Sequence, residues 1–150
     1  MNCPLCTIPL QEQQRVIFEN ELSFVCVNIE PLTPSHIMIL PKKHITSLEN
    51  LTAEEAKDLF FLISRFSKHL PNQFQTKGAL TILNHGELSS QEHLHFHILA
   101  SDAALRNIVS SYLHVPVRKK LSLEELEAFA VKIKQNFFID PLTNYNNDPH

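Results

Sequence analysis

The chain has 150 residues, of which 43% are hydrophobic, and its formal net charge is −3, as expected for one globular domain. This charge argues against nucleic acid as a partner, because nucleic-acid-binding proteins carry clustered basic residues. The N-terminus does not resemble a signal peptide, and the longest apolar run, Leu59 to Ile63, is too short to span a membrane. We therefore expect a soluble cytoplasmic protein with no membrane partner.

Three residue counts narrow the possible chemistry. The chain has nine histidines, three cysteines and only two glycines. Neither Gly78 nor Gly86 has a glycine neighbour, which excludes a glycine-rich phosphate loop. An odd number of cysteines does not suggest a disulfide framework. If the chain binds phosphate, side chains and ordinary loop amides must provide the contacts.

The first part of the chain predicts three strands. Residues 15–18 and 24–27 are short apolar runs, and the polar segment 19–23 between them favours a hairpin. Two prolines within residues 30–34 interrupt regular structure, because proline cannot donate a ladder hydrogen bond. An apolar strand over residues 36–40 follows, and Pro41 ends it.

Two capping boxes predict the helices. Thr52 and Glu55 start a helix whose apolar residues recur at helical spacing, and Pro71 is predicted to end it. Ser122 and Glu125 start a C-terminal helix. With further strands at 79–83 and 93–98, these elements predict an α+β domain over residues 1–139, with a mainly antiparallel sheet of five strands, a central helix and a C-terminal helix. Residues 140–150 are predicted to form a flexible tail.

The strand over residues 93–98 is the strongest functional signal. It alternates imidazoles with apolar side chains: His93, Leu94, His95, Phe96, His97 and Ile98. Residues two apart on a strand share a face, so the three imidazoles lie together and the apolar residues face the core. Two interpretations stay open from the residues alone. All three imidazoles bind one metal ion, or one is a nucleophile toward phosphorus while its neighbours donate to phosphate oxygens.

A Cys-x-x-Cys pair near the N-terminus, Cys3 and Cys6, has the spacing of two zinc ligands. The alternatives are two small buried apolar residues or a redox dithiol. If the pair binds zinc, His44 and His93 are candidates for the other two ligands. Cys26 lies in an apolar strand and is expected in the core.

Several of these segments together resemble the histidine-triad nucleotide-binding and hydrolase family. The matching segments are residues 93–99, the block from Asn28 to His44, and the turn Asn84-His85-Gly86, and the resemblance covers Cys3 to Leu99. It implies hydrolysis of a phosphoanhydride or phosphoramidate bond at an α-phosphate through a covalent nucleotidyl-His95 intermediate. His97 and His36 would contact the same phosphate. The alternative is a non-catalytic nucleotide-binding or partner-interaction protein of the same fold.

The resemblance also implies how a nucleotide is bound. Asn28 would contact the ribose, Ile29 the base, Asn84 the leaving group or bridging oxygen, and Ser90 the phosphate. The segment around Ser90 departs from the family pattern, because it lacks the usual glycine. Asparagine rather than aspartate at position 28, and the absence of tryptophan, favour the dinucleoside polyphosphate branch, with substrates such as diadenosine tetraphosphate.

Two further implications concern assembly. Some members of the family hold a structural zinc ion with residues that correspond here to Cys3, Cys6, His44 and His93. This would make His93 structural and leave His95 and His97 for the chemistry. Members also commonly form homodimers through the central helix and an adjoining strand, and we expect the same here.

Overall fold

The computed structural model describes residues 3–114 and 120–135. The chain divides into two compact units, Met1–Val109 and Ser110–His150. The first unit contains the sheet and every residue of the candidate site. Its last helix, α3 (Leu105–Leu113), runs across the boundary between the units.

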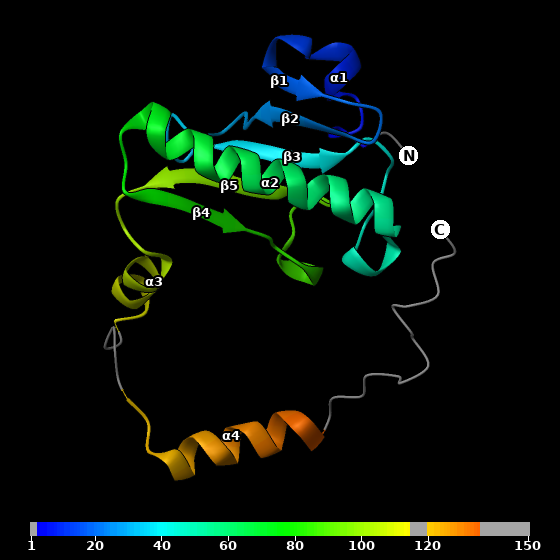
Figure 1. Ribbon diagram of the computed structural model, residues 1–150. Coiled ribbons are helices and arrows are strands. Elements are labelled where there is room, and N and C mark those ends of the chain that lie inside the picture. The colour runs from blue at the N-terminus through cyan, green and yellow to red at the C-terminus, as the bar shows by residue number, and fades with distance from the viewer. Residues whose placement is uncertain (1–2, 115–119, 136–150) are drawn as a thin grey trace. The chain divides into compact units, whose positions relative to one another are not determined.

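The first unit is built on a five-stranded sheet (Figure 1). Its strands are β1 (Val16–Glu19), β2 (Ser23–Val27), β3 (Ile37–Pro41), β4 (Gly78–Ile82) and β5 (Phe96–Ser101). They lie in the order β1-β2-β3-β5-β4, and each neighbouring pair is antiparallel. The predicted α+β class and the five-stranded antiparallel sheet are confirmed. Pairing of β3 with β5 sets Met38 opposite His97 and joins segments far apart in the sequence.

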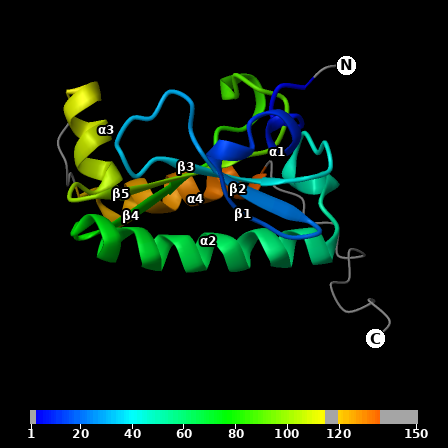
Figure 2. The ribbon, with the colours of Figure 1, turned by 90° about the horizontal axis from the view of Figure 1, so that it is seen from above.

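Helix α2 (Ala53–Phe74) covers one face of the sheet, as Figures 1 and 2 show. Alternate strand residues, including Ile39, Phe96 and Ile98, form one buried cluster with Leu59 and Leu62 of this helix. Each fully buried side chain of this size contributes about 1.5–3 kcal/mol. The apolar residues of the histidine segment therefore face α2, as their alternation predicted.

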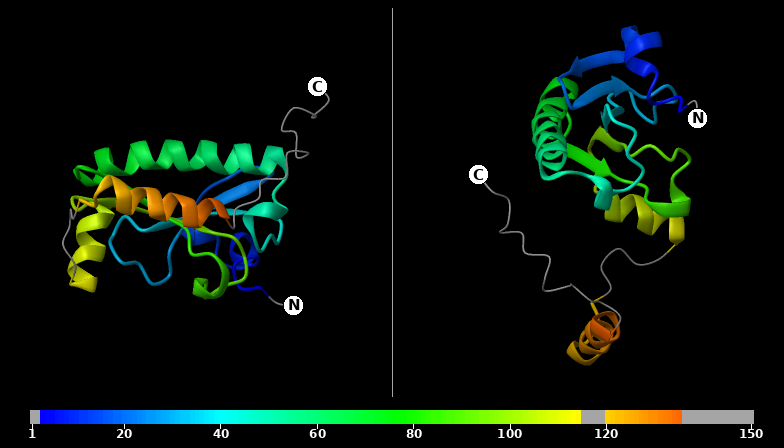
Figure 3. Two further views of the ribbon diagram at one scale, coloured as in Figure 1. Left: turned by 90° about the horizontal axis from the view of Figure 1, so that it is seen from below. Right: turned by 90° about the vertical axis from the view of Figure 1, so that its right-hand side faces the viewer.

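The opposite face of the sheet carries the N-terminal segment. Helix α1 (Ile8–Gln11) and the short helix η3 (Gly86–Leu88) lie on the side away from α2 (Figure 2; Figure 3, right). Ile8 packs there with Phe24, Cys26 and Met38 in a second buried cluster. Cys26 is a core residue, as predicted. Two other short helices are η1 (Gln13–Arg15) and η2 (Leu48–Asn50).

The prediction that Pro71 ends the central helix is wrong. Helix α2 continues through Pro71 to Phe74, and Gln75 caps it in the left-handed conformation (φ 54°). Proline lacks the N–H needed for one helical hydrogen bond. Here that loss falls in the last turns of a 22-residue helix, where the carbonyl of Pro71 still accepts from the amides of Gln75 and Thr76.

The histidine strand starts later than predicted. β5 begins at Phe96, so His93 and His95 precede it. Its partner β3 ends at Pro41, and the amide of Leu94 donates instead to the carbonyl of Ile45, beyond that strand (2.7 Å). His93 and His95 are nevertheless buried, with exposed fractions of 0% and 5%.

The second unit contains helix α4 (Leu123–Gln135). Its capping box is present: the Ser122 amide donates to Glu125 Oε2 (2.7 Å), and the Glu125 amide donates to Ser122 Oγ (3.1 Å). The predicted tail, residues 140–150, lies outside the described residues, and the assignment of residues 1–139 to one domain stays a prediction. Among the helices of the described ranges, none is long and apolar enough to cross a membrane.

Candidate active site and metal centre

A pocket of about 480 Å³ opens on the face of the sheet opposite α2. Seven candidates from the sequence line it, three histidines and four predicted nucleotide-binding residues: Asn28, Ile29, His36, Asn84, Ser90, His95 and His97. They come from the residues just after β2, the approach to β3, the loop after β4, the segment leading into β5, and β5 itself. The antiparallel pairing of β3 with both β2 and β5 brings these segments to one place.

A backbone contact fixes the orientation of the His95 imidazole. Its Nδ1 lies 2.7 Å from the carbonyl oxygen of His93. A carbonyl oxygen only accepts hydrogen bonds, so Nδ1 carries the proton and Nε2 of the neutral ring keeps its lone pair. The ring thus has the tautomer that a nucleophile acting through Nε2 requires.

His36 and His97 form a directed pair of imidazoles. The amide of Leu32 donates to Nδ1 of His36 (3.1 Å), so the neutral His36 ring carries its proton on Nε2. The Nε2–H of His36 donates a hydrogen bond to Nδ1 of His97, and the two nitrogens are 2.9 Å apart. The remaining Nε2–H of His97 is left as a donor. A neutral donor at this position suits a phosphate oxygen.

Burial keeps both rings of this pair uncharged near neutral pH. It lowers the pKa of His36. Burial, with the neighbouring His95 and His36 rings, lowers the pKa of His97 to about 4. An imidazole accepts a hydrogen bond through a ring nitrogen only in its neutral form. These pKa shifts therefore agree with the directed contact between the two rings.

Asn28 is held at the end of β2 by its own backbone environment. Its side-chain Oδ1 accepts a hydrogen bond from the backbone N–H of Glu30 (2.8 Å). Its own backbone N–H donates to the backbone carbonyl of His36 (3.1 Å). Its Nδ2 lies 3.4 Å from His36 Nε2. The amide group of Asn28 thus sits beside the histidine pair.

The other candidate ligands lie on loops. Ile29 is 71% exposed, so its side chain is accessible to a flat apolar ligand. Asn84 follows β4, and Ser90 lies in the segment between η3 and His93. The hydroxyl of Ser89 donates to the carbonyl of Gln91 (2.6 Å), which constrains the loop around Ser90 despite the missing glycine.

Four side chains from three distant segments form a candidate metal centre. The ligand atoms of Cys3, Cys6, His44 and His93 all lie within 4.8 Å of one another. Nδ1 of His93 is 3.6 Å from Cys3 Sγ and 3.2 Å from Cys6 Sγ, and Nδ1 of His44 is 3.4 Å from Cys6 Sγ. Tetrahedral zinc with ordinary bond lengths sets sulfur-to-nitrogen edges of about 3.5 Å. The donor set and its spacing fit zinc.

The protonation of the centre also favours a cation. Nε2 of His93 lies 2.9 Å from the carbonyl of Pro41 and donates to it, so Nδ1 presents its lone pair to the two sulfurs. Burial and the adjacent Cys3 raise the pKa of the Cys6 thiol to about 11. Metal binding at Cys6 would displace the proton of this thiol.

His93 and His95 thus face different partners. Nδ1 of His93 is directed at the cysteines, whereas Nδ1 of His95 donates to a backbone carbonyl. This arrangement disfavours the interpretation in which His93, His95 and His97 share one metal ion.

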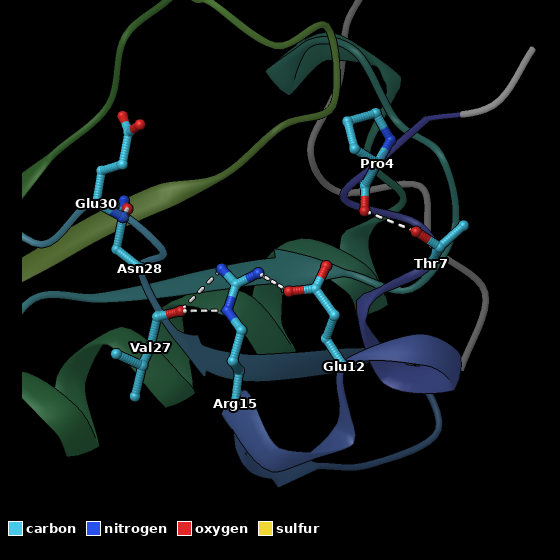
Figure 4. A network of polar contacts seen from close by, with 7 residues as sticks. All are labelled: Pro4, Thr7, Glu12, Arg15, Val27, Asn28 and Glu30. Atoms are coloured by element: carbon cyan, nitrogen blue, oxygen red, sulfur yellow. Dashed lines mark hydrogen bonds and ion pairs between the residues drawn. The ribbon is translucent and has the colours of Figure 1, made fainter.

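Sequence reasoning missed one pair in the pocket wall. Glu12 and Arg15 both line the pocket, and the guanidinium Nη1 forms an ion pair with Glu12 Oε2 (Figure 4). Nε and Nη2 of Arg15 donate to the carbonyl of Val27, at 3.1 Å and 3.0 Å. Arg15 was predicted to begin a strand and instead ends η1. No sequence pattern marks its contact with Val27, which depends on how β1 and β2 pair.

Comparison with known proteins assigns the family. Residues 10–104 match the family model described as HIT domain. The chain is 34% identical over 92 residues to bis(5'-adenosyl)-triphosphatase of Dictyostelium discoideum, covering 60% of this chain and 62% of that protein. It is 28% identical over 98 residues to Protein hit of Bacillus subtilis, covering 65% and 68%. The chain thus spans less than two thirds of the length of the Dictyostelium relative.

The fold agrees with that assignment. The crystal structure of a member of the HIT family from Bacillus subtilis superposes with a TM-score of 0.68 at 22% identity, covering 93% of this chain and 99% of the other. At this identity the likeness concerns the fold alone. The family match covers more than half of the chain and includes the whole sheet. The chain belongs to the HIT domain family.

Proposed function

We propose that this chain hydrolyses dinucleoside polyphosphates by nucleophilic attack of His95 on an α-phosphorus. The observation that carries the proposal is the contact between His95 Nδ1 and the carbonyl of His93, which places the proton of the neutral ring on Nδ1 and its lone pair on Nε2, on a ring that lines the pocket. The name of the Dictyostelium relative, a bis(5'-adenosyl)-triphosphatase, supports this class of substrate.

The reaction proceeds in two displacements. Nε2 of His95 forms a bond to the α-phosphorus, and the bond from that phosphorus to the bridging oxygen breaks with its electron pair on the leaving nucleotide. Water then attacks the same phosphorus, the bond to Nε2 breaks, and a nucleoside monophosphate leaves. Splitting one hard step into two is the usual gain from covalent catalysis. Nε2–H of His97, directed by its contact with His36, donates to a phosphate oxygen as charge develops there.

The remaining pocket residues position the substrate. Asn28 would bind the ribose hydroxyls, Ile29 would pack on the base, Asn84 would contact the bridging oxygen, and Ser90 would donate to the phosphate. The support for these roles is that all four line the same pocket as His95. Holding the phosphorus and nucleophile in line supplies much of the rate in phosphoryl transfer.

We also propose that Cys3, Cys6, His44 and His93 hold a structural zinc ion. Bound there, zinc links the N-terminal segment to the residues after β3 and before β5, stabilising the fold. Zinc would take no part in the chemistry, because it would be bound by His93 and not by His95 or His97. The support is the four-ligand cluster and the His93 tautomer set by Pro41.

The homodimer and the cytoplasmic location belong to the same proposal. β4 is an edge strand of the sheet, and Phe60 on α2 is 59% exposed. A second copy that pairs through β4 and α2 would cover both.

The decisive test compares the wild-type protein with His95→Asn on diadenosine triphosphate, diadenosine tetraphosphate and adenosine phosphoramidate. We expect the variant to lose turnover by roughly 10³-fold or more. Wild-type protein quenched in base during turnover should carry a nucleotidyl adduct, detected by mass spectrometry, and His95→Asn should carry none.

His69→Asn, at an exposed position on α2, is the matched control and should keep full activity. Retained turnover in His95→Asn would overturn the mechanism. Saturable nucleotide binding by a wild-type protein with no turnover on any substrate would establish the non-catalytic alternative instead.

A further inference from the structure

The wall of the pocket next to Asn28 carries a fixed carboxylate that the proposed mechanism does not use. Glu12 lies at the end of α1, and its Oε2 pairs with Arg15. The side chains of Glu12 and Arg15 are 34% and 15% exposed. Two donor contacts from Arg15 to the Val27 carbonyl hold the guanidinium in place. The carboxylate is therefore positioned by a partly buried framework rather than by solvent.

Its second oxygen is available to a ligand. Among the described residues, no protein hydrogen bond is formed by Oε1 of Glu12. Figure 4 shows this oxygen directed away from Arg15, toward the side on which Pro4 lies, and Pro4 also lines the pocket. An ionised carboxylate oxygen is a pure acceptor, so a ligand group that meets it must be a donor.

A succession of contacts separates Glu12 from the imidazoles at which the proposed phosphate chemistry would occur. His97 contacts His36, and the His36 ring lies beside the side chain of Asn28. The residue before Asn28 is Val27, whose carbonyl binds Arg15, which in turn binds Glu12. A nucleotide with its α-phosphorus at His95 and its ribose at Asn28 would extend its base toward Glu12.

The charges in the pocket support the same orientation. The carboxylates of Glu12 and Glu30 both belong to its wall, and Arg15 is already paired with Glu12. A polyphosphate would be repelled from this end, whereas the imidazoles at the other end offer N–H donors. The uncharged part of the ligand, the base, fits the carboxylate end.

We propose that Glu12, held by Arg15, recognises an exocyclic amino group of the nucleobase and so determines base specificity. This inference rests on the proposed function, because it takes the pocket to bind a nucleotide through His95. Oε1 of Glu12 accepts from the amino group, as the 6-amino group of adenine can donate. Arg15 is a positioning residue, which fixes the carboxylate and leaves one oxygen for the base.

The test is a binding measurement that requires no turnover. Calorimetric titrations compare adenosine 5'-monophosphate with purine riboside 5'-monophosphate, which lacks only the 6-amino group. Hydrogen bonds to charged groups contribute enough to change affinity by about tenfold or more. We expect the wild-type protein to bind the adenosine nucleotide more tightly by that factor.

The variants separate recognition from a structural role. In Glu12→Gln the single carbonyl oxygen stays with Arg15 and an NH₂ group meets the base, so the ratio of the two Kd values should fall to about one. Glu12→Ala should give the same ratio. Arg15→Lys, which loses the bidentate contact with Val27, should lower the ratio, whereas a purely structural role would weaken both ligands equally. Glu19→Gln, at a surface residue paired with Lys42, should leave the ratio unchanged.

Equal affinity of the wild-type protein for both nucleotides would overturn the inference, as would an unchanged ratio in both Glu12 variants. The failure of the proposed function looks different. If Glu12 discriminates between the two nucleotides but the protein hydrolyses no substrate, only the hydrolase proposal is contradicted. Hydrolysis that depends on His95, without discrimination, would remove only the role of Glu12.

Discussion

Nε2 of His36 lies 2.9 Å from Nδ1 of His97, although 60 residues separate the two rings in the sequence. The Leu32 amide on the far side of His36 fixes which nitrogen carries the proton. The protein backbone thus determines, through two imidazoles, that His97 presents an N–H to the pocket. Similar outer contacts orient histidine ligands in metal sites.

Replacement of His36 should therefore impair catalysis through His97. We expect His36→Ala to lower kcat by about 10- to 100-fold, the loss that is typical when the hydrogen-bond partner that orients a metal-bound histidine is removed. His36→Gln, whose amide can donate from a similar place, should recover part of that loss. Steady-state kinetics on diadenosine triphosphate measure both. Equal losses in the two variants would argue against a directed hydrogen bond.

The metal centre predicts a specific pattern of zinc loss. The wild-type protein should contain about one zinc ion per chain, and Cys3→Ser should contain little. Because the ion would link distant segments, we expect the variant to lose about 5 °C or more in Tm. Elemental analysis and thermal unfolding measure these effects.

Cys26→Ala is the matched control for zinc content. Cys26 is buried in the core, where burial raises the pKa of its thiol to about 11, and the variant should keep its zinc. Loss of zinc from Cys26→Ala, or its retention in Cys3→Ser, would contradict the assigned ligands.

The buried imidazoles predict lower stability in acid. The pKa of His97 falls from 6.5 to about 4 in the folded chain, so between these values the unfolded chain binds more protons. The free energy of unfolding is therefore highest above pH 6.5. It decreases as the pH falls toward 4, and protonation of His97 accounts for up to about 3 kcal/mol of that decrease. Burial of His36 acts in the same direction.

Urea unfolding at pH 7.0, 5.5 and 4.5 measures this dependence. His97→Gln removes the titrating group and should flatten the decrease in the free energy of unfolding between pH 6.5 and 4.5. A variant with the same pH dependence as the wild-type protein would show that other groups are responsible.

The first capping box should stabilise α2. The amide of Glu55 donates to Thr52 Oγ1 (3.2 Å), and the amide of Thr52 donates to Glu55 Oε2 (2.8 Å). Chiefly the second of these contacts lowers the pKa of Glu55. We expect Thr52→Ala to reduce the free energy of unfolding by about 1 kcal/mol, whereas Thr52→Ser should preserve it. Urea denaturation at pH 7 compares them, and equal stabilities would rule out a contribution from the cap.

The proposed dimer predicts opposite outcomes for two neighbouring phenylalanines on α2. The centroid of the Phe60 ring lies 6.1 Å from that of Phe96 on β5, the strand that pairs with the edge strand β4. Phe61, also exposed, lies with Phe18 of β1. Sedimentation should show that Phe60→Glu yields monomers and that Phe61→Glu stays dimeric. A monomeric wild-type protein would remove the dimer from the proposal.

The sequence by itself determined the elements whose signals are local. Short apolar runs identified the other strands, and period-two alternation identified the core-facing side of the histidine segment, because successive strand residues point to opposite faces. Capping boxes located the starts of α2 and α4, because they satisfy backbone groups within one turn. The Cys-x-x-Cys spacing and the histidine pattern indicated the two candidate sites, and the family resemblance implied the roles of Asn28, Ile29, His36, Asn84 and Ser90.

Other features were decided only by the tertiary structure. Burial of α2 against the sheet carries the helix past Pro71, because its packing outweighs one lost hydrogen bond. The proposed difference in role between His93 and His95 depends on the backbone carbonyls of Pro41 and His93, which select the tautomer of each ring. Pairing of Arg15 with Val27 and Glu12 likewise follows from strand pairing. Such contacts join residues whose separation along the chain carries no period, so no sequence pattern could predict them.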